Sequence, residues 1–370
     1  MKHSLGLGSL LIGLTFIPAA YAADSNALEE DVTVLKEDTA EINSRLDDML
    51  SISGYTDVEY VVTDKDGSYP GFRLHHLSLF FEKRITDQWR FFSEIEYEDT
   101  PKFEADEKSF TDADSGKKVN QFDAAQGKLF VEAVNLSFLW RPDASLRVGR
   151  FFTPAGIWNV DHYPPFVPTQ ERPLHIRAIF PQVFDGAMAY GTRPLGGSFL
   201  KYELYWGNGE GNTGKKDSNS HKAVGLNTGL LLPFLKHTEI GLTYYTDTLN
   251  DRTEKTATGA HMKIKAGGLA FQAEYAVADY KPTTGSKYER TGYYAQLMYD
   301  IGNWTAGVRN NFYDSNSLGT NELVANSVFL NYHVSSSIVL KVEHHQFDYD
   351  DAAKDDYTST LFSAVANLGN

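Results

Sequence analysis

Alternation between apolar and polar residues constrains the fold of this chain more than any other feature. From residue 52 onward the pattern returns in run after run, for example LAFQAEYAVADY at 269–280 and SIVLKVEHHQF at 337–347. A period of two indicates β-strands, because successive side chains of a strand point to opposite faces of the sheet. Taking each run as one strand predicts sixteen strands, with eighteen as the alternative count. The predicted strands are residues 52–62, 71–83, 89–98, 127–140, 145–152, 184–193, 198–206, 222–232, 237–247, 256–265, 269–279, 290–299, 303–313, 323–333, 337–347 and 358–368.

The connections between the predicted strands alternate in length. One set consists of tight turns such as RPDAS and DIGN, whereas the other set is generally longer and polar, as in NGEGNTGKKDSNS and DYKPTTGSKYER. Short turns at one end of an antiparallel sheet and long loops at the other are typical of outer-membrane barrels. An even strand count also returns both ends of the barrel to the periplasmic side. We therefore predict an all-β fold, a closed antiparallel transmembrane β-barrel at residues 52–370.

A bilayer dictates which residues of such a barrel face outward. Hydrocarbon offers no hydrogen bonds, so the sheet must close, and apolar side chains must face the lipid while polar ones may face the lumen. In the strand at 269–279 this parity places Leu269 and Tyr275 outside and Glu274 inside. The charged residues predicted to line the lumen are Lys201, Glu274, Arg309 and Lys341.

Tryptophan placement and the charged inner positions separate this barrel from a soluble antiparallel sandwich, which would alternate equally well. Trp89, Trp140 and Trp304 fall beside predicted short turns, and Trp206 falls beside a long loop. Tryptophan is enriched at both membrane interfaces, where it contributes to aromatic girdles. The pattern favours the membrane barrel.

The first 22 residues have the organisation of a secretory signal peptide. Lys2 and His3 precede an apolar run at residues 5–18, and the sequence Ala20-Tyr21-Ala22 supplies small residues for signal peptidase. The apolar run is shorter than the roughly 20 residues that a spanning helix needs. We predict cleavage after Ala22 and a location in the outer membrane of a Gram-negative bacterium.

Residues 23–51 carry a heptad pattern rather than a period of two. Apolar or small residues alternate at spacings of four and three, as in the a/d seam of a coiled coil. They are Leu28, Val32, Leu35, Thr39, Ile42, Leu46 and Met49. A single helix this short is marginal in water. We expect a periplasmic coiled coil with neighbouring subunits over residues 28–49; the alternative is an amphipathic helix lying on its own barrel.

Composition excludes several other classes of protein. The chain has no cysteine, which rules out disulfide scaffolds, cysteine–zinc sites and haem attached through cysteine. Its formal net charge of −15 argues against nucleic acid as a partner, because nucleic-acid-binding surfaces are basic. No cofactor is predicted.

One long connection, at residues 153–183, is rich in proline, which restricts the backbone and lets a loop keep a fixed shape. In strand count and loop order the chain resembles the general porins, whose third loop folds into the barrel and narrows the pore. The resemblance implies a pore constriction here. The apolar side chains of Phe166 and Ile179 are expected to pin the loop to the inner wall. Charged groups facing each other across such a gap filter solutes. The candidate constriction residues are Arg147, Arg150, Asp161, His162, Glu171, Arg172, His175 and Arg177.

The segment GKLFVEAVNLSFLWRPDASLRVGRFFTPAG at 127–156 resembles the phosphate-selective porin O/P family, in which a strand, a tight turn and a VG(R/Q)F..P.G strand end lead into the constriction loop. This resemblance implies a trimer and an anion such as phosphate as solute. The predicted inward residues mix both signs, for example Lys263 with Glu343, whereas a dense ladder of basic residues marks the family. The matching residues are Val148, Gly149, Arg150, Phe151, Pro154, Gly156 and Gly186.

Catalytic and metal sites find little support in the sequence. His345 near Asp348, and Asp161 beside His162, are carboxylate–histidine neighbours without a serine nucleophile at a recognisable spacing. The chain is therefore not predicted to be an enzyme. His75 and His76 are adjacent in a strand and should point to opposite faces, so no metal site is predicted.

The predicted function is that of a water-filled porin, through which small hydrophilic solutes or ions diffuse passively. Anions such as phosphate are among the predicted solutes, and the barrel is predicted to contact outer-membrane lipid. The alternative is a surface receptor or adhesin that uses the acidic loops at 99–123 and 348–356, and a barrel hydrolase is a weaker alternative.

Overall fold

The computed structural model describes residues 49–99, 103–111, 118–124, 128–210, 217, 219–233, 235 and 238–369. The strands belong to the unit Leu50–Asn370. The predicted signal peptide, and all but the last three residues of the predicted coiled-coil segment, lie outside the described residues. Within the described part of the chain, no helix is long and apolar enough to cross a bilayer.

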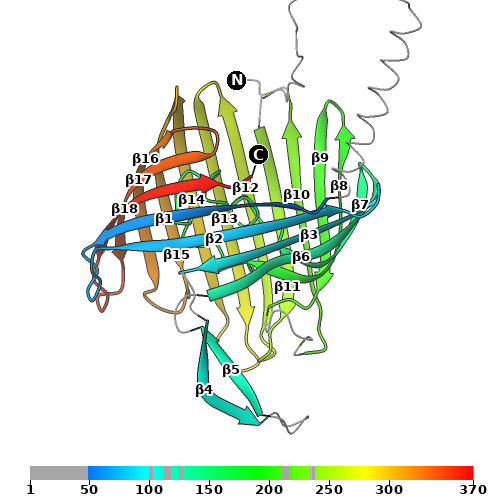
Figure 1. Ribbon diagram of the computed structural model, residues 1–370, viewed down its shortest axis with the longest axis horizontal. Helices are drawn as coiled ribbons and strands as arrows, with labels where there is room; N and C mark the ends of the chain where they lie inside the picture. Colours follow the sequence, from blue (N-terminus) through cyan, green and yellow to red (C-terminus); the bar gives the residue numbers. More distant parts are fainter. Residues whose placement is uncertain are drawn as a thin grey trace, which may run out of the picture. The chain divides into compact units, whose positions relative to one another are not determined.

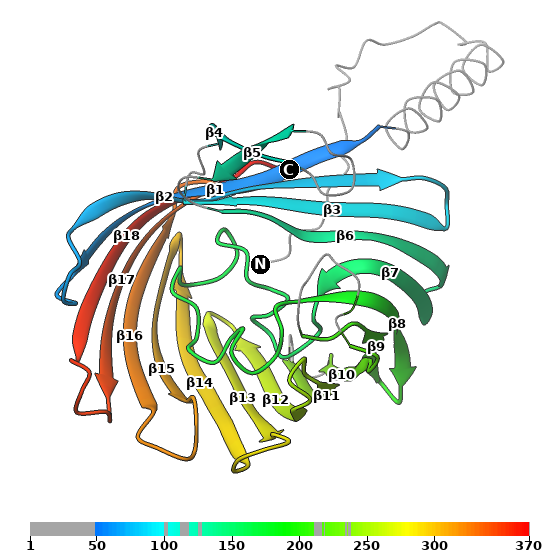
Figure 2. The ribbon, with the colours of Figure 1, turned by 90° about the horizontal axis from the view of Figure 1, so that it is seen from below.

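Sixteen antiparallel strands of the described residues close into one barrel (Figures 1 and 2). The ring closes where β1 pairs with β18, with Tyr55 opposite Asn367 and Val58 opposite Ala364. The predicted sixteen-stranded barrel is confirmed, and each predicted strand end lies within two residues of the observed one. The barrel strands are β1 (Ser51–Thr63), β2 (Gly71–Arg84), β3 (Trp89–Glu98), β6 (Lys128–Arg141), β7 (Ala144–Phe152), β8 (Val183–Leu195), β9 (Ser198–Gly207), β10 (Ala223–Leu232), β11 (Thr238–Thr248), β12 (Glu254–Ala266), β13 (Leu269–Lys281), β14 (Tyr288–Ile301), β15 (Trp304–Asp314), β16 (Glu322–His333), β17 (Ile338–Tyr349) and β18 (Tyr357–Asn367).

The long connection between β3 and β6 is not wholly irregular. It contains β4 (Phe103–Thr111) and β5 (Lys118–Ala124), which pair with each other in a separate two-stranded sheet. The sequence predicts this stretch as one long loop. Its many charged residues break the alternation that made the barrel strands recognisable.

Loop length alternates around the barrel as predicted. The seven joins from β2–β3 to β16–β17 at one end contain two to five residues each, whereas those at the other end contain five to thirty. Two-residue turns such as that at Gly267 rely on a left-handed backbone, with φ of 61° at this residue. The asymmetry matches the short turns and long loops of outer-membrane barrels.

Side chains alternate between the two faces of the wall. In β17, Lys341, Glu343 and His345 are buried inside, whereas Leu340 and Val342 are exposed outside. β13 repeats the pattern, because Glu274 is buried while Leu269 and Tyr275 are exposed. Charged groups therefore lie on the covered inner face and apolar groups on the outer face, which is the arrangement that a bilayer requires.

The tryptophans divide between the barrel ends and the interior. Trp89 and Trp304 begin strands after short turns, and their rings pack against Phe138 and Tyr332 at centroid distances of 5.0 and 4.5 Å. Trp140 and Trp206 also lie near strand ends and are exposed. The positions of these four residues fit aromatic girdles. Trp158 differs, because it lies in a loop and is buried.

An irregular register between β1 and β2 changes the direction of one side chain. Asp57 pairs with His76 but the next residue, Val58, pairs with Leu74, so His75 is the extra residue of a β-bulge. The rings of His75 and His76 consequently lie side by side, with centroids 3.6 Å apart. The expectation that these two histidines face opposite sides of the wall is wrong, because it assumed a regular strand.

Candidate pore constriction

The loop that joins β7 to β8, residues 153–182, runs inside the ring of strands, where Figure 2 shows it as a green coil. We call it the inner loop. Irregular segments of this length are uncommon in compact proteins and usually serve a function. Three groups of inward-facing side chains on distant strands hold the inner loop against the wall.

Glu274 on β13 fixes the first part of the inner loop. Its Oε1 accepts hydrogen bonds from the backbone N–H of Trp158, at 2.9 Å, and from the hydroxyl of Tyr294, at 3.0 Å. Gly156 approaches the same carboxylate so closely that an added Cβ would lie 1.7 Å from Oε2. Its backbone φ of 61° is also left-handed. Only glycine fits this position without strain.

Lys341 and Glu343 on β17 hold the middle of the inner loop. Lys341 Nζ donates hydrogen bonds to the carbonyl oxygens of Pro164 and Val167, at 2.7 and 2.8 Å. Glu343 Oε1 accepts a hydrogen bond from the backbone N–H of Gln170, at 2.6 Å. Hydrogen bonds to charged groups are among the stronger ones, so this contact ties the loop firmly to the wall.

Arg309 on β15 holds the stretch that follows. Its Nη1 donates to Thr169 Oγ1 at 2.6 Å and its Nη2 donates to the carbonyl oxygen of Glu171 at 2.7 Å. The guanidinium also lies over the ring of Trp158, 5.6 Å from the centroid. One arginine thus joins two separate parts of the loop through hydrogen bonds and a cation–π contact.

These contacts define what the predicted lumen residues do. Glu274, Arg309 and Lys341 point inward and are buried. The inner loop covers all three, and their charged groups form hydrogen bonds with it. Lys201 on β9 is partly exposed instead, with Nζ 3.5 Å from a carboxylate oxygen of Glu203. Of the four, Lys201 is the one whose charge reaches open lumen.

Two predicted constriction residues are buried histidines. His175 is 3% exposed and its ring stacks on Tyr294, with centroids 6.1 Å apart. Burial, together with the nearby positive charge of Arg309, lowers the pKa of His175 to about 3. It is therefore neutral at neutral pH and adds no charge to a filter. His162 is also buried, with Nε2 3.5 Å from Glu132 Oε2.

The predicted residues Glu171, Arg172 and Arg177 lie in the second half of the inner loop. Burial raises the pKa of the Glu171 carboxyl. Nη1 of Arg172 is buried and has no hydrogen-bond partner among the described residues. Arg177 is partly exposed, and its Nη2 lies 3.6 Å from Glu132 Oε1. Arg177 is the member of this group whose charge is nearest to solvent.

Asp161 occupies the most open position among the predicted residues of the inner loop. Its side chain is 64% exposed, and Oδ2 accepts a hydrogen bond from Lys263 Nζ at 2.8 Å. Asp161 lines two cavities of about 270 and 320 Å³. Arg147 and Glu203 line the first cavity and Lys263 lines the second. Charges of both signs therefore meet around Asp161.

Two predictions for this region do not hold. Arg150 shares the outward parity of Leu146 and Val148, and it pairs in bidentate fashion with Asp185, at 2.7 and 2.9 Å. It therefore lies on the outer face, whereas Arg147 points inward. Phe166 is 72% exposed and does not pin the loop to the wall, although Ile179 is fully buried.

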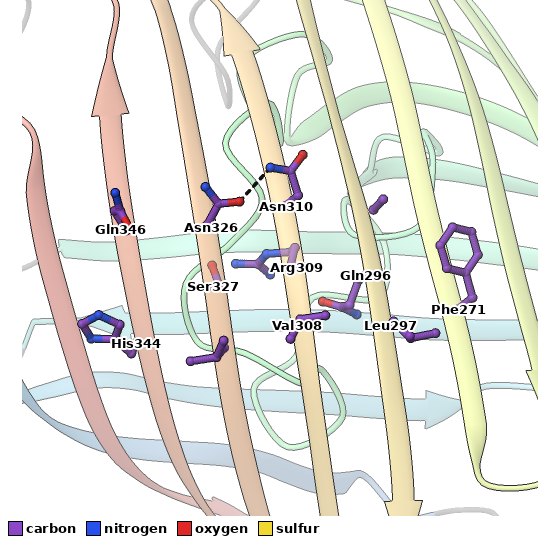
Figure 3. Close-up of a pocket in the computed structure, with 12 residues that line it drawn as sticks. Phe271, Gln296, Leu297, Val308, Arg309, Asn310, Asn326, Ser327, His344 and Gln346 are labelled. Carbon is purple, nitrogen blue, oxygen red and sulfur yellow. Dashed lines mark hydrogen bonds between the residues drawn. The ribbon is translucent and has the colours of Figure 1, made fainter.

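A further hollow, of about 470 Å³, lies on the outer face of the wall over β13 to β17 (Figure 3). Exposed apolar side chains such as Val308 and Leu297 line it together with polar ones. Asn310 Nδ2 donates a hydrogen bond to Asn326 Oδ1 at 2.9 Å, and His344 and Gln346 lie on the same face. This hollow faces away from the lumen and is not part of a passage.

Sequence reasoning missed two residues that hold the inner loop. Gln170 Nε2 donates a hydrogen bond to Asp57 Oδ2 at 2.8 Å, which connects the loop to β1. The inward parity of Asp57 could have identified it as a wall residue. Nothing in the sequence marks Gln170, because its role depends on where the loop crosses the lumen.

The family described as Gram-negative porin matches residues 146–352. An uncharacterized protein of Aquifex aeolicus (strain VF5) is 31% identical over 162 residues, which are 43% of this chain. This chain spans about a third of the length of that relative, since the match covers 32% of it.

Solved outer-membrane structures share the fold. An anion-selective porin from Comamonas acidovorans has a TM-score of 0.62 at 12% identity, over 86% of this chain and 99% of that one. The trimer form of OmpT from Vibrio cholerae has a TM-score of 0.54 at 10% identity, over 86% and 100%. The channel DcaP of Acinetobacter baumannii has a TM-score of 0.53 at 12% identity, over 86% and 96%. With more than half of its residues matched by the family, this chain belongs to the Gram-negative porins.

Proposed function

We propose that this chain forms a water-filled channel in the outer membrane of a Gram-negative bacterium, through which small hydrophilic solutes or ions diffuse passively. One observation carries the proposal: a long loop lies inside a closed sixteen-stranded barrel and is held there by buried charged residues of the wall. A barrel of this size is wide enough for an aqueous channel. Family and fold point to a channel rather than an enzyme.

The passage runs beside Asp161, where the two cavities meet the inner loop. Solutes are sieved by the space that the loop leaves open and are sorted by the charges that line it. Arg147 and Lys263 supply positive charge, and Asp161 and Glu203 supply negative charge. Water screens exposed charges incompletely in a narrow lumen, so these groups act on ions that pass.

Anions such as phosphate are the solutes that the family resemblance favours. Arg147 and Arg177 support this assignment, because guanidinium groups bind carboxylate and phosphate oxygens well. Arg172 and His162 act as supports of the loop in this scheme, since Nη1 of Arg172 and the whole of His162 are buried. The likeness to the Comamonas porin is consistent with this assignment, although it extends only to the fold.

The channel works as a homotrimer that assembles through the barrel walls and residues 28–49, after cleavage of the signal peptide behind Ala22. The outer hollow in Figure 3 supports contact between walls. Amide and imidazole groups there would face hydrocarbon in a monomer, which is unfavourable for polar side chains. The trimer form known for Vibrio cholerae OmpT offers a precedent on the same fold.

Conductance across a planar lipid bilayer tests the proposal. Detergent-purified protein should produce stepwise current increases, and the reversal potential in a salt gradient should give the ion preference. Detergent alone and heat-unfolded protein serve as controls. A membrane that stays silent with protein shown to be folded would contradict the proposal.

A further inference from the structure

The β-bulge in β2 brings together groups that a regular strand would separate. His75 is the extra residue between the pairs Asp57–His76 and Val58–Leu74. Both histidine rings lie on the inner side of the wall, facing carboxylates of β1 that share the inward parity of Tyr55. A bulge is a common device for redirecting a side chain. Here it places two imidazoles beside the same carboxylates.

The donor atoms of this cluster converge. His76 Nδ1 lies 2.8 Å from Asp57 Oδ1, and His75 Nδ1 lies 2.9 Å from Glu59 Oε1. His75 Nδ1 also lies 3.7 Å from Asp57 Oδ2. One ligand atom from each of Asp57, His75 and His76 lies within 4.8 Å of the other two. Small shifts of the side chains would place these three atoms at metal–ligand distances from a single bound ion.

The cluster is buried and carries an excess of negative charge. Asp57 and Glu59 are at most 1% exposed, and Glu59 Oε2 accepts no hydrogen bond from any described residue. A third carboxylate, Glu98, lies 3.8 Å from His75 Nε2. Two cations among the described residues pair with these carboxylates: Lys128 lies 3.6 Å from Glu98, and Arg73 lies 3.8 Å from Glu59 but also pairs with Asp99. Buried carboxylates at this density are costly unless a cation neutralises them.

We propose that Asp57, Glu59, His75 and His76 bind a divalent transition-metal ion of the zinc type. Two imidazole nitrogens and one oxygen of Asp57 converge, and Glu59 Oε1, 2.9 Å from His75 Nδ1, is the fourth donor of a set that suits four-coordinate zinc. Calcium and magnesium prefer oxygen ligands alone, so the two histidines select against them. Glu98 stands behind His75 and supports its ring, as carboxylates commonly do for metal-binding histidines.

The position of the site gives the ion a structural consequence. Gln170 of the inner loop donates its Nε2 hydrogen bond to Asp57 Oδ2, at 2.8 Å. A metal bound by Asp57 would therefore sit where β1, β2 and the inner loop meet. The ion would fix the wall and, through Gln170, the part of the loop that Glu343 also holds.

Zinc binding to the folded full chain tests the proposal without reference to conduction. The protein is purified in detergent without a histidine tag, treated with a chelator, and titrated with ZnCl2 in a calorimeter. We expect one ion per chain, and affinity at least about tenfold weaker in His76→Gln and in Asp57→Asn. Titration with CaCl2 should give no comparable heat. A visible spectrum with Co2+ should show tetrahedral coordination that is lost in both variants.

The chain offers a matched control in its other histidine pair. His344 and His345 are adjacent in β17, where the register is regular, and His344 lies on the outer face. His344→Gln should bind zinc as the unaltered chain does. Circular dichroism and heat-dependent gel mobility establish that each variant is folded. If His76→Gln does not fold, His75→Gln serves instead, since His75 is the bulged residue. Zinc binding that is absent from the folded chain, or equal in chain and variants, would overturn the proposal.

Discussion

At the scale of single residues, exposure decides which charges can act on a solute. Asp161 is exposed to both cavities, whereas Arg309 and Lys341 donate hydrogen bonds to carbonyl oxygens of the inner loop. The same inward parity therefore yields two roles. An inward charge that the loop covers supports the structure, and one that the loop leaves open belongs to the passage.

Asp161→Asn should shift the channel toward anions. The substitution removes a negative charge and frees Lys263, while Arg147 stays in place. Two unit charges about 4 Å apart in water interact with roughly 1 kcal/mol, so the loss of one charge beside a passing ion corresponds to about a fivefold change in the permeability ratio. Reversal potentials in a KCl gradient measure this ratio, and Arg147→Ala should shift it the opposite way.

Asp351 provides the control for that experiment. It forms an exposed pair with Lys354 in the loop after β17, as Asp161 does with Lys263. Asp351→Asn should leave the permeability ratio unchanged. An equal shift in both variants would show that Asp161 acts only through the net charge of the protein.

Gly156→Ala should destabilise the inner loop. A left-handed backbone costs alanine about 1–3 kcal/mol, and the added Cβ would in addition clash with Glu274. Unfolding by urea in lipid vesicles measures the loss of stability. Gly267→Ala is the matched control, because Gly267 has the same φ of 61° but no atom within 4 Å of an added Cβ. Equal losses in the two variants would argue against the close contact with Glu274.

At the scale of elements, the inner loop is an irregular chain made rigid by its surroundings. Its prolines restrict the backbone, and Glu274, Arg309 and Lys341 supply hydrogen bonds that helices and strands would otherwise provide internally. Its buried histidine, His175, is expected to make this anchoring sensitive to acid.

The anchoring should weaken as pH falls. The pKa of His175 is about 3 in the folded protein and about 6.5 in an unfolded chain. Between these values the unfolded chain binds a proton that the folded one does not, so stability falls with decreasing pH, by up to about 1.4 kcal/mol per pH unit. Thermal unfolding in detergent at pH 7 and pH 4 should show a larger drop for the unaltered protein than for His175→Gln.

His221→Gln tests whether any histidine would have this effect. His221 is exposed and lies in the loop before β10. The variant should keep the full drop in stability between pH 7 and pH 4. An unchanged drop in His175→Gln would mean that other groups cause the acid sensitivity.

At the scale of the whole molecule, the ring closes within the described strands alone, because β1 pairs directly with β18. The barrel therefore does not need the heptad segment to satisfy its backbone. The segment is expected to act between subunits, where three short helices together can bury an apolar seam that one helix cannot.

Removing residues 23–48 from the mature chain should leave the pore intact but loosen the assembly. Single-channel conductance should stay the same, since β1 begins at Ser51. The proposed trimer should dissociate on a gel at a lower temperature, because the contacts of the seam are lost. A dissociation temperature equal to that of the full mature chain would favour the alternative, a helix that lies on its own barrel.

Local periodicity allowed most of the fold to be predicted. Strand ends such as those of β13 and β17 fell within two residues of the structure, because alternation is imposed residue by residue wherever one face meets lipid. The candidate site was harder to predict. Asp161 proved open, but Arg150 lies outside and His175 is neutral. The outer position of Arg150 follows from the same parity as Leu146 and Val148 and was open to prediction, whereas the neutrality of His175 depends on burial and on Arg309, which is remote in sequence.

The sequence by itself determined the positions of the strands of the barrel wall, their inner and outer faces and the end that carries the long loops. Each of these features follows from local backbone geometry and from whether a face of the strand meets lipid or water, which a few neighbouring residues are enough to show. Only the tertiary structure decided that His75 bulges toward His76, that Gly156 meets Glu274, and that the inner loop covers Arg309. Such contacts join residues that are far apart in the chain, and their free energies depend on distances that no local pattern encodes.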